Sequence, residues 1–93
     1  MTEKNKNDLF VKYTNMVGQT VIDCVLTTNQ TYVEALKGQN KFDTEAQKVA
    51  FQMTYNSVMS ILNEDAKIYL ATIYGDLRAY LTTLIEAEVK RNK

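Results

Sequence analysis

The side chains that most often carry out catalysis or bind metal ions are scarce in this sequence. The chain of 93 residues has no histidine and a single cysteine, Cys24. Histidine is the commonest general base and metal ligand, so its absence excludes imidazole-dependent triads and a cysteine–histidine zinc site within one chain. Cys24 falls on an apolar helical face without a cationic neighbour in sequence, which favours a buried, unreactive thiol.

The acidic residues also lack the spacing of a carboxylate site. Glu64 and Asp65 are adjacent and would point in different directions on a helix, where they suit a first turn. Glu86 and Glu88 are two residues apart and do not face each other. The three glycines are isolated from one another, so there is no glycine-rich phosphate loop. We therefore expect a protein that is not an enzyme and that binds no cofactor or metal ion.

Tyrosine is the remaining residue type of functional interest, with six copies that lie mostly on or beside apolar stripes. One interpretation is that the rings pack at the edge of the core, with hydroxyls reaching water or backbone. The other is a protein interface, where tyrosine and methionine are enriched. Both interpretations stay open. The residues that we expect at such an interface are Phe51, Tyr55, Val58, Leu62, Tyr69 and Tyr80.

The element that would position most of these residues is a central stretch, residues 43–63. Residues 49–63 carry no charge, which is too apolar for an exposed segment and too short and polar for a bilayer span. Four of the expected interface residues recur there at steps of three and four. The pattern predicts a central helix at about 43–63 that other helices cover. Asp43 or Thr44 would begin it, and Thr44 with Gln47 has the spacing of a capping box.

A long helix is predicted before it, from Asp8 to about Leu36, because apolar residues recur at helical spacing. Asp8 would cap it, with Asn7 as the alternative cap, residues 1–7 would be disordered, and Gly38 would end it in the left-handed conformation.

A β-hairpin is the alternative for residues 20–33, which are rich in β-branched side chains. The helix is favoured because Val21-Ile22 and Val25-Leu26 are adjacent apolar pairs, and because a lone hairpin would have no sheet partner.

Two further helices are predicted in the remainder of the chain. Asn63 would cap a short helix at about 64–74, and Asp76 a last helix at about 76–91. A kink at Asn63 is the alternative to a turn there. Since proline is absent, long uninterrupted helices are favoured. The fold class that follows is all-α, a three- to four-helix bundle in a single domain, residues 1–93.

The charge balance and the length of the chain limit the kinds of partner that we expect. Eleven basic and eleven acidic residues cancel, so no net field attracts nucleic acid or anionic lipid. The first residues lack the basic start and apolar run of a signal peptide, so we expect a soluble, cytoplasmic chain without a transmembrane segment. A chain this short buries only roughly 60–65% of its unfolded surface. We therefore expect a homo-oligomer, with any other protein partner unknown.

Residues 84–90, Leu-Ile-Glu-Ala-Glu-Val-Lys, resemble the "IEA-x-V" ending of small phage and prophage proteins, in particular the soluble tail of the LLH-type phage holins. Those holins begin with a membrane-spanning helix, and residues 1–40 here contain none, so pore formation is not implied. The resemblance implies a small helical protein from a phage or mobile element, as part of an assembly.

The function we expect is thus a non-enzymatic interaction or structural module that self-associates. A peripheral membrane or lysis-accessory protein and a weak nucleic-acid-binding bundle are the alternatives, the first from the holin-like tail and the second from the basic residues at the C-terminus.

Overall fold

The computed structural model describes the backbone of residues 2–91 and the side chains of residues 8–91. The described elements are α1 (Thr2–Thr28), the π-helical segment η1 (Asn29–Val33), α2 (Glu34–Gly38), α3 (Thr44–Ile61), α4 (Glu64–Tyr74) and α5 (Leu77–Arg91). No strand occurs within residues 2–91, so the predicted all-α class is confirmed.

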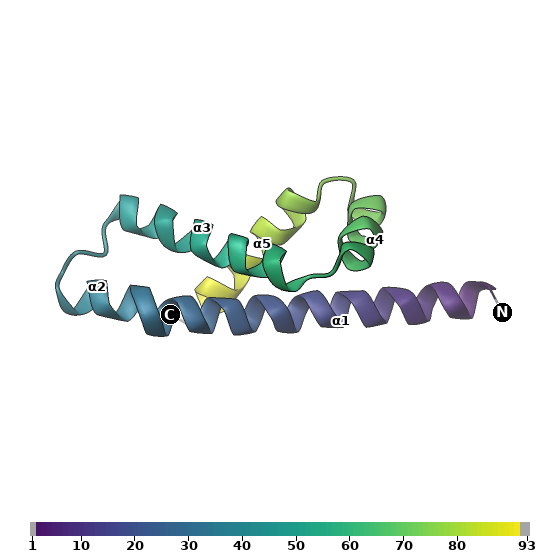
Figure 1. Cartoon of the computed structure of the whole chain (residues 1–93), viewed down its shortest axis with the longest axis horizontal. Helices are drawn as coiled ribbons and strands as arrows, with labels where there is room; N and C mark the ends of the chain where they lie inside the picture. The colour runs from purple at the N-terminus through teal and green to yellow at the C-terminus, as the bar shows by residue number, and fades with distance from the viewer. Residues whose placement is uncertain (1, 92–93) are drawn as a thin grey trace.

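The first three elements run on without a break and form one rod along the length of the molecule (Figure 1). α3 returns antiparallel along the rod, α4 lies over the N-terminal part of α1, and α5 runs back toward the middle of the rod (Figure 1). The molecule measures 56 × 19 × 19 Å. It is therefore elongated, and the long rod sets its length.

The long first helix is confirmed, but its predicted start is wrong. α1 begins at Thr2, so Asp8 lies inside the helix and does not cap it. The expectation of a disordered segment 1–7 stays a prediction, because Met1 and the side chains of residues 2–7 lie outside the described part of the structure.

The hairpin alternative for residues 20–33 is wrong, because these residues are helical throughout. The π-helical segment within them changes which side chain is buried. Val33 follows the buried Thr28 by five residues and is 6% exposed, whereas Tyr32, which follows Thr28 at the usual helical step of four, is half-buried. A wide turn adds one residue to the helical repeat, so the face that packs inward continues at Val33.

The end of α2 also differs from expectation. Gly38 is the last helical residue, and Asn40 instead takes the left-handed conformation, with φ of 56°. The N–H of Lys41 donates to the carbonyl of Leu36 (2.8 Å) and that of Asn40 to Lys37 (3.1 Å). This is the Schellman pattern, in which asparagine can replace glycine.

Side-chain caps begin the other three helices. Asp43 accepts from the N–H of Ala46 (2.9 Å), Asn63 from Ala66 (2.8 Å) and Asp76 from Ala79 (3.1 Å). The predicted caps at Asn63 and Asp76 are confirmed. The Thr44–Gln47 capping box is wrong because Asp43 is the N-cap and Thr44 the first helical residue.

The boundary between α3 and α4 is a turn and not a kink. Leu62 has extended backbone, with ψ of 133°, and directs its side chain into the core, where it is 3% exposed.

The core lies where α1, α3, α4 and α5 meet. Its largest fully buried side chains come from all four helices: Val17, Val21, Val25, Val58, Leu70, Leu81 and Ile85. The N-terminal third of α1 extends past this core (Figure 1). The rod is therefore longer than the part of it that the other helices cover.

Candidate interaction surfaces

The predicted interface residues of α3 fall into two groups. Val58 is 0% and Leu62 3% exposed, and both belong to the core cluster with residues of α1 and α5. The chain's own helices cover this stripe, so these two residues are core residues and present no surface to a partner. Phe51 and Tyr55 are only half-buried and pack against the edge of the core.

Tyr55 and Tyr80 each have an aromatic or cationic neighbour within the chain. The guanidinium of Arg78 lies 4.7 Å from the centre of the Tyr55 ring, a cation–π contact. The ring of Tyr80 stacks on Tyr74 with centres 3.9 Å apart. Both tyrosines therefore fit the core-edge interpretation, and an interface role for them stays a prediction.

Tyr69 is the predicted residue that lies beside an exposed apolar region. Its ring centre is 4.9 Å from that of Tyr13 in α1. The two rings form part of a shallow hollow of about 320 Å³ between α1 and α4, which Leu9, Ile68 and Thr72 also line. Leu9 is 42% and Ile68 62% exposed.

A run of three apolar residues in α1 enlarges this region. Leu9, Phe10 and Val11 are 42%, 41% and 53% exposed. Consecutive helical residues point about 100° apart, so α4 alone cannot cover all three. We name Leu9, Phe10, Val11, Ile68 and Tyr69 the N-terminal apolar surface.

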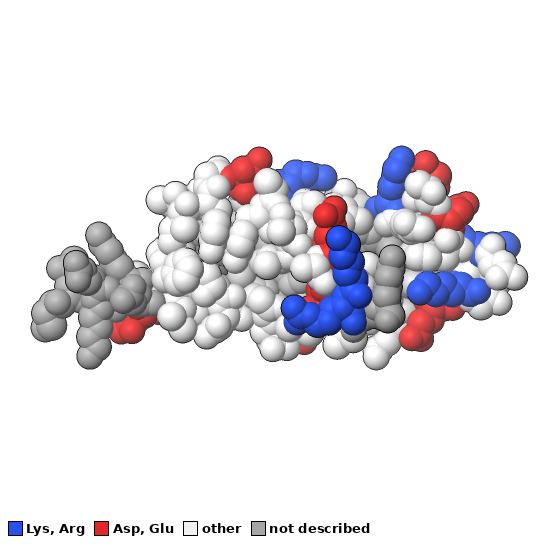
Figure 2. Space-filling model, turned by 180° about the vertical axis from the view of Figure 1, so that it is seen from behind, with Lys and Arg blue, Asp and Glu red and all other residues white. Residues whose placement is uncertain are grey.

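Among the described side chains on the face shown in Figure 2, most of the charged ones lie over the half that carries α2 and the end of α5. Sequence reasoning missed four of the five residues of the N-terminal apolar surface. The three consecutive apolar residues Leu9-Phe10-Val11 were a signal of this surface. Because a helix cap was expected at Asp8, the run was interpreted as the start of an ordinary amphipathic helix.

Few groups in the described residues have chemistry suited to catalysis. Burial, and then the negative charge of Asp23, raise the pKa of the Cys24 thiol, which is 4% exposed and thus poorly nucleophilic. Within the described residues, no cluster of three or more histidine, cysteine, aspartate or glutamate side chains could hold a metal ion.

None of the helices in the described part of the chain has the length and apolar character required to cross a membrane. Comparison of the chain with protein-family models, curated proteins and solved structures finds no match.

Proposed function

We propose that the protein is a non-enzymatic helical module that self-associates through the N-terminal apolar surface. The observation that carries the proposal is the exposure of four apolar side chains at this end of the bundle. Leu9, Phe10, Val11 and Ile68 are 42%, 41%, 53% and 62% exposed.

The charges support a second copy as the partner. Copies with a net charge of zero do not repel each other over distance. The ammonium of Lys12 lies 5.5 Å from the centre of the Tyr13 ring, and Asp65 lines the hollow beside the same tyrosine. Two copies related by a two-fold axis present the same surface to each other, so the cation of one copy can face the anion of the other.

The sequence resemblance of residues 84–90 to phage proteins agrees with a role in an assembly. The phage or mobile-element origin itself stays a prediction.

The proposal is tested by size-exclusion chromatography with light scattering on the wild type and two matched variants. Ile68 and Ile61 are both 62% exposed, but only Ile68 belongs to the N-terminal apolar surface. At tens of micromolar we expect an oligomeric wild type, a monomeric Ile68→Lys variant and an Ile61→Lys variant with the mass of the wild type. A wild type that is strictly monomeric would remove the proposal, as would an Ile68→Lys variant that keeps the oligomeric mass.

A further inference from the structure

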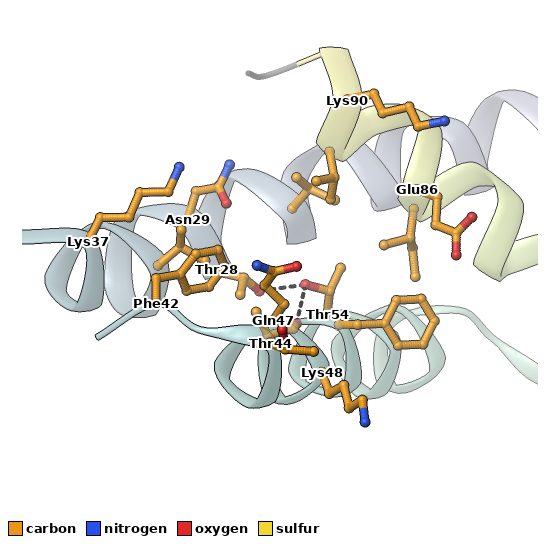
Figure 3. Close-up of a pocket in the computed structure, with 16 residues that line it drawn as sticks. Thr28, Asn29, Lys37, Phe42, Thr44, Gln47, Lys48, Thr54, Glu86 and Lys90 are labelled. Atoms are coloured by element: carbon orange, nitrogen blue, oxygen red, sulfur yellow. Dashed lines mark hydrogen bonds between the residues drawn. The ribbon is translucent and has the colours of Figure 1, made fainter. Parts of the chain in front are cut away.

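A second hollow lies at the opposite end of the bundle. It has a volume of about 630 Å³ and lies between the rod at η1 and α2, the first half of α3, and the C-terminal half of α5 (Figure 3). We name it the η1 cleft. We propose that the η1 cleft binds a monomeric long-chain carboxylate, with the hydrocarbon tail inside the cleft and the carboxylate at its basic rim.

The interior of the cleft suits a hydrocarbon chain. The apolar residues in its walls are Val25, Val33, Phe42, Ala50, Phe51, Ile85 and Val89. Three threonines line it. The buried hydroxyls of Thr28 and Thr54 are bonded to each other (2.8 Å), and Thr54 also bonds to the carbonyl of Ala50 (2.9 Å) (Figure 3). These two buried hydroxyls therefore need no polar ligand, while the third, Thr44, is exposed. The volume lies within the range of small-molecule sites.

The rim supplies positive charge in a chain whose net charge is zero. Lys37, Lys48 and Lys90 line the cleft from three different helices, against the single acid Glu86. Lys48 points away from the cleft in Figure 3 and pairs with Glu45 at 3.5 Å. Lys37 is the better candidate for the carboxylate, because Figure 3 draws it and Asn29 at the same end of the cleft, where the Lys37 ammonium lies 5.6 Å from the centre of the Phe42 ring. An ammonium and an amide N–H are both donors to a carboxylate.

The π-helical segment keeps the cleft open. Asn29 and Val33, the first and last residues of η1, both line it. In an uninterrupted α-helix, Tyr32 would follow the buried Thr28 at the usual step of four, and its ring would occupy the space that Val33 leaves free. Wide turns of this kind are rare and are found frequently at functional sites.

A small amphiphile fits these observations better than a peptide. A peptide would bring backbone N–H and C=O groups that need partners, and the interior hydroxyls are already bonded to the protein. A long-chain carboxylate needs polar contacts only at one end, which is where Asn29 and Lys37 lie.

The test is a calorimetric titration of the full chain with sodium oleate below its micellar concentration, compared with oleyl alcohol of the same chain length. We expect oleate to bind with a dissociation constant in the micromolar range, oleyl alcohol to bind at least tenfold more weakly, and helicity by circular dichroism to be retained at saturation. Absence of oleate binding, equal binding of the alcohol, or loss of helicity would each overturn the proposal. The proposal would also be overturned if the protein floated with oleate-containing vesicles but did not bind monomeric oleate.

Matched variants test whether the ligand binds in the η1 cleft. Val89 lines the cleft and is 42% exposed, while Val49 is 46% exposed on α3 and does not line it. Val89→Trp should weaken oleate binding tenfold or more by filling the cleft, and Val49→Trp should leave it unchanged. Lys37→Glu should weaken it likewise, with Lys41→Glu in the neighbouring loop as its control. Wild-type affinity in Val89→Trp or in Lys37→Glu contradicts the assignment. The oligomeric mass should not change in these variants, so this test is independent of self-association.

Discussion

Individual threonine hydroxyls are hydrogen-bonded within the helix in a stretch that is rich in β-branched residues. Thr20, Thr27 and Thr31 donate to the carbonyls four residues earlier, at 2.8, 2.9 and 2.7 Å. Threonine in a helix satisfies its hydroxyl in this way without leaving the helical backbone. The polar groups that would otherwise favour a strand or turn are therefore bonded locally within the rod.

The stacked pair Tyr74–Tyr80 should make the free energy of unfolding vary with pH in the alkaline range. Burial first, and then the hydrogen bond and charge of Tyr74, raise the pKa of Tyr80 from 10.0 to about 12. The folded state holds this proton more tightly than the unfolded chain, so the contribution to stability is complete below pH 10 and is lost as pH rises toward about 12. Urea unfolding across this range should show the loss in the wild type.

The Tyr80→Phe variant should show a smaller loss over the same range because it lacks the titrating group. Tyr32→Phe, which leaves the stacked pair intact, is the control and should follow the wild type. Identical slopes for wild type and Tyr80→Phe would contradict this origin of the pH dependence.

Among the elements, η1 has the largest effect on how the rod packs. It inserts one residue between Thr28 and Val33 without ending the helix, and the N–H of Glu34 donates to the carbonyl of Asn29 five residues earlier. An α-helix bonds over four residues. The segment therefore separates two α-helical parts of the rod whose buried faces would be out of phase in an uninterrupted α-helix.

Deletion of Gln30, an exposed residue within η1, should convert the rod into a continuous α-helix that still buries Val33. We expect the free energy of unfolding to change by less than about 1 kcal/mol, since no buried side chain is displaced. Deletion of Gln19, an exposed residue within α1, should lower it by roughly 2–5 kcal/mol, because Val17 and the residues before it rotate out of the core.

Chemical denaturation, monitored by circular dichroism, measures the free energy of unfolding of both deletion variants. Equal losses in the two variants would show that η1 is not a one-residue insertion in an otherwise regular helix.

The whole molecule is longer than a compact domain of its size. Its radius of gyration is 15.1 Å, whereas about 12 Å is expected for a compact chain of 93 residues. The excess comes from the rod, whose N-terminal third extends past the core (Figure 1). The α1 residues of the N-terminal apolar surface lie in that third, and the other end of the rod lines the η1 cleft. The two surfaces that we propose for binding are thus at opposite ends and can be altered separately.

If two copies cover the N-terminal apolar surface, stability must depend on concentration. A folded dimer is favoured over unfolded monomers by mass action, and for a chain of this length we expect the melting temperature to rise by a few degrees for each tenfold increase in concentration. Differential scanning fluorimetry at several concentrations measures this. The Ile61→Lys variant should retain the dependence, the Ile68→Lys variant should lose it, and a concentration-independent wild type would speak against assembly.

The sequence by itself determined the features that depend on contacts within a few residues. The helical periodicity and the caps at Asn63 and Asp76 are local, so the all-α class and the order of the helices followed from the residues. The lack of histidine and the isolation of the acidic residues are likewise properties of the chain alone.

The tertiary structure decided which apolar residues are covered. Val58 and Leu62 are buried, whereas Val49, Met53 and Ile61 of the same uncharged stretch are 46%, 38% and 62% exposed. That choice depends on how α1 and α5, which are distant in sequence, pack on α3. The same is true of Val33 in place of Tyr32, because a π-helical turn has no local sequence signal here and is fixed by what the rod packs against.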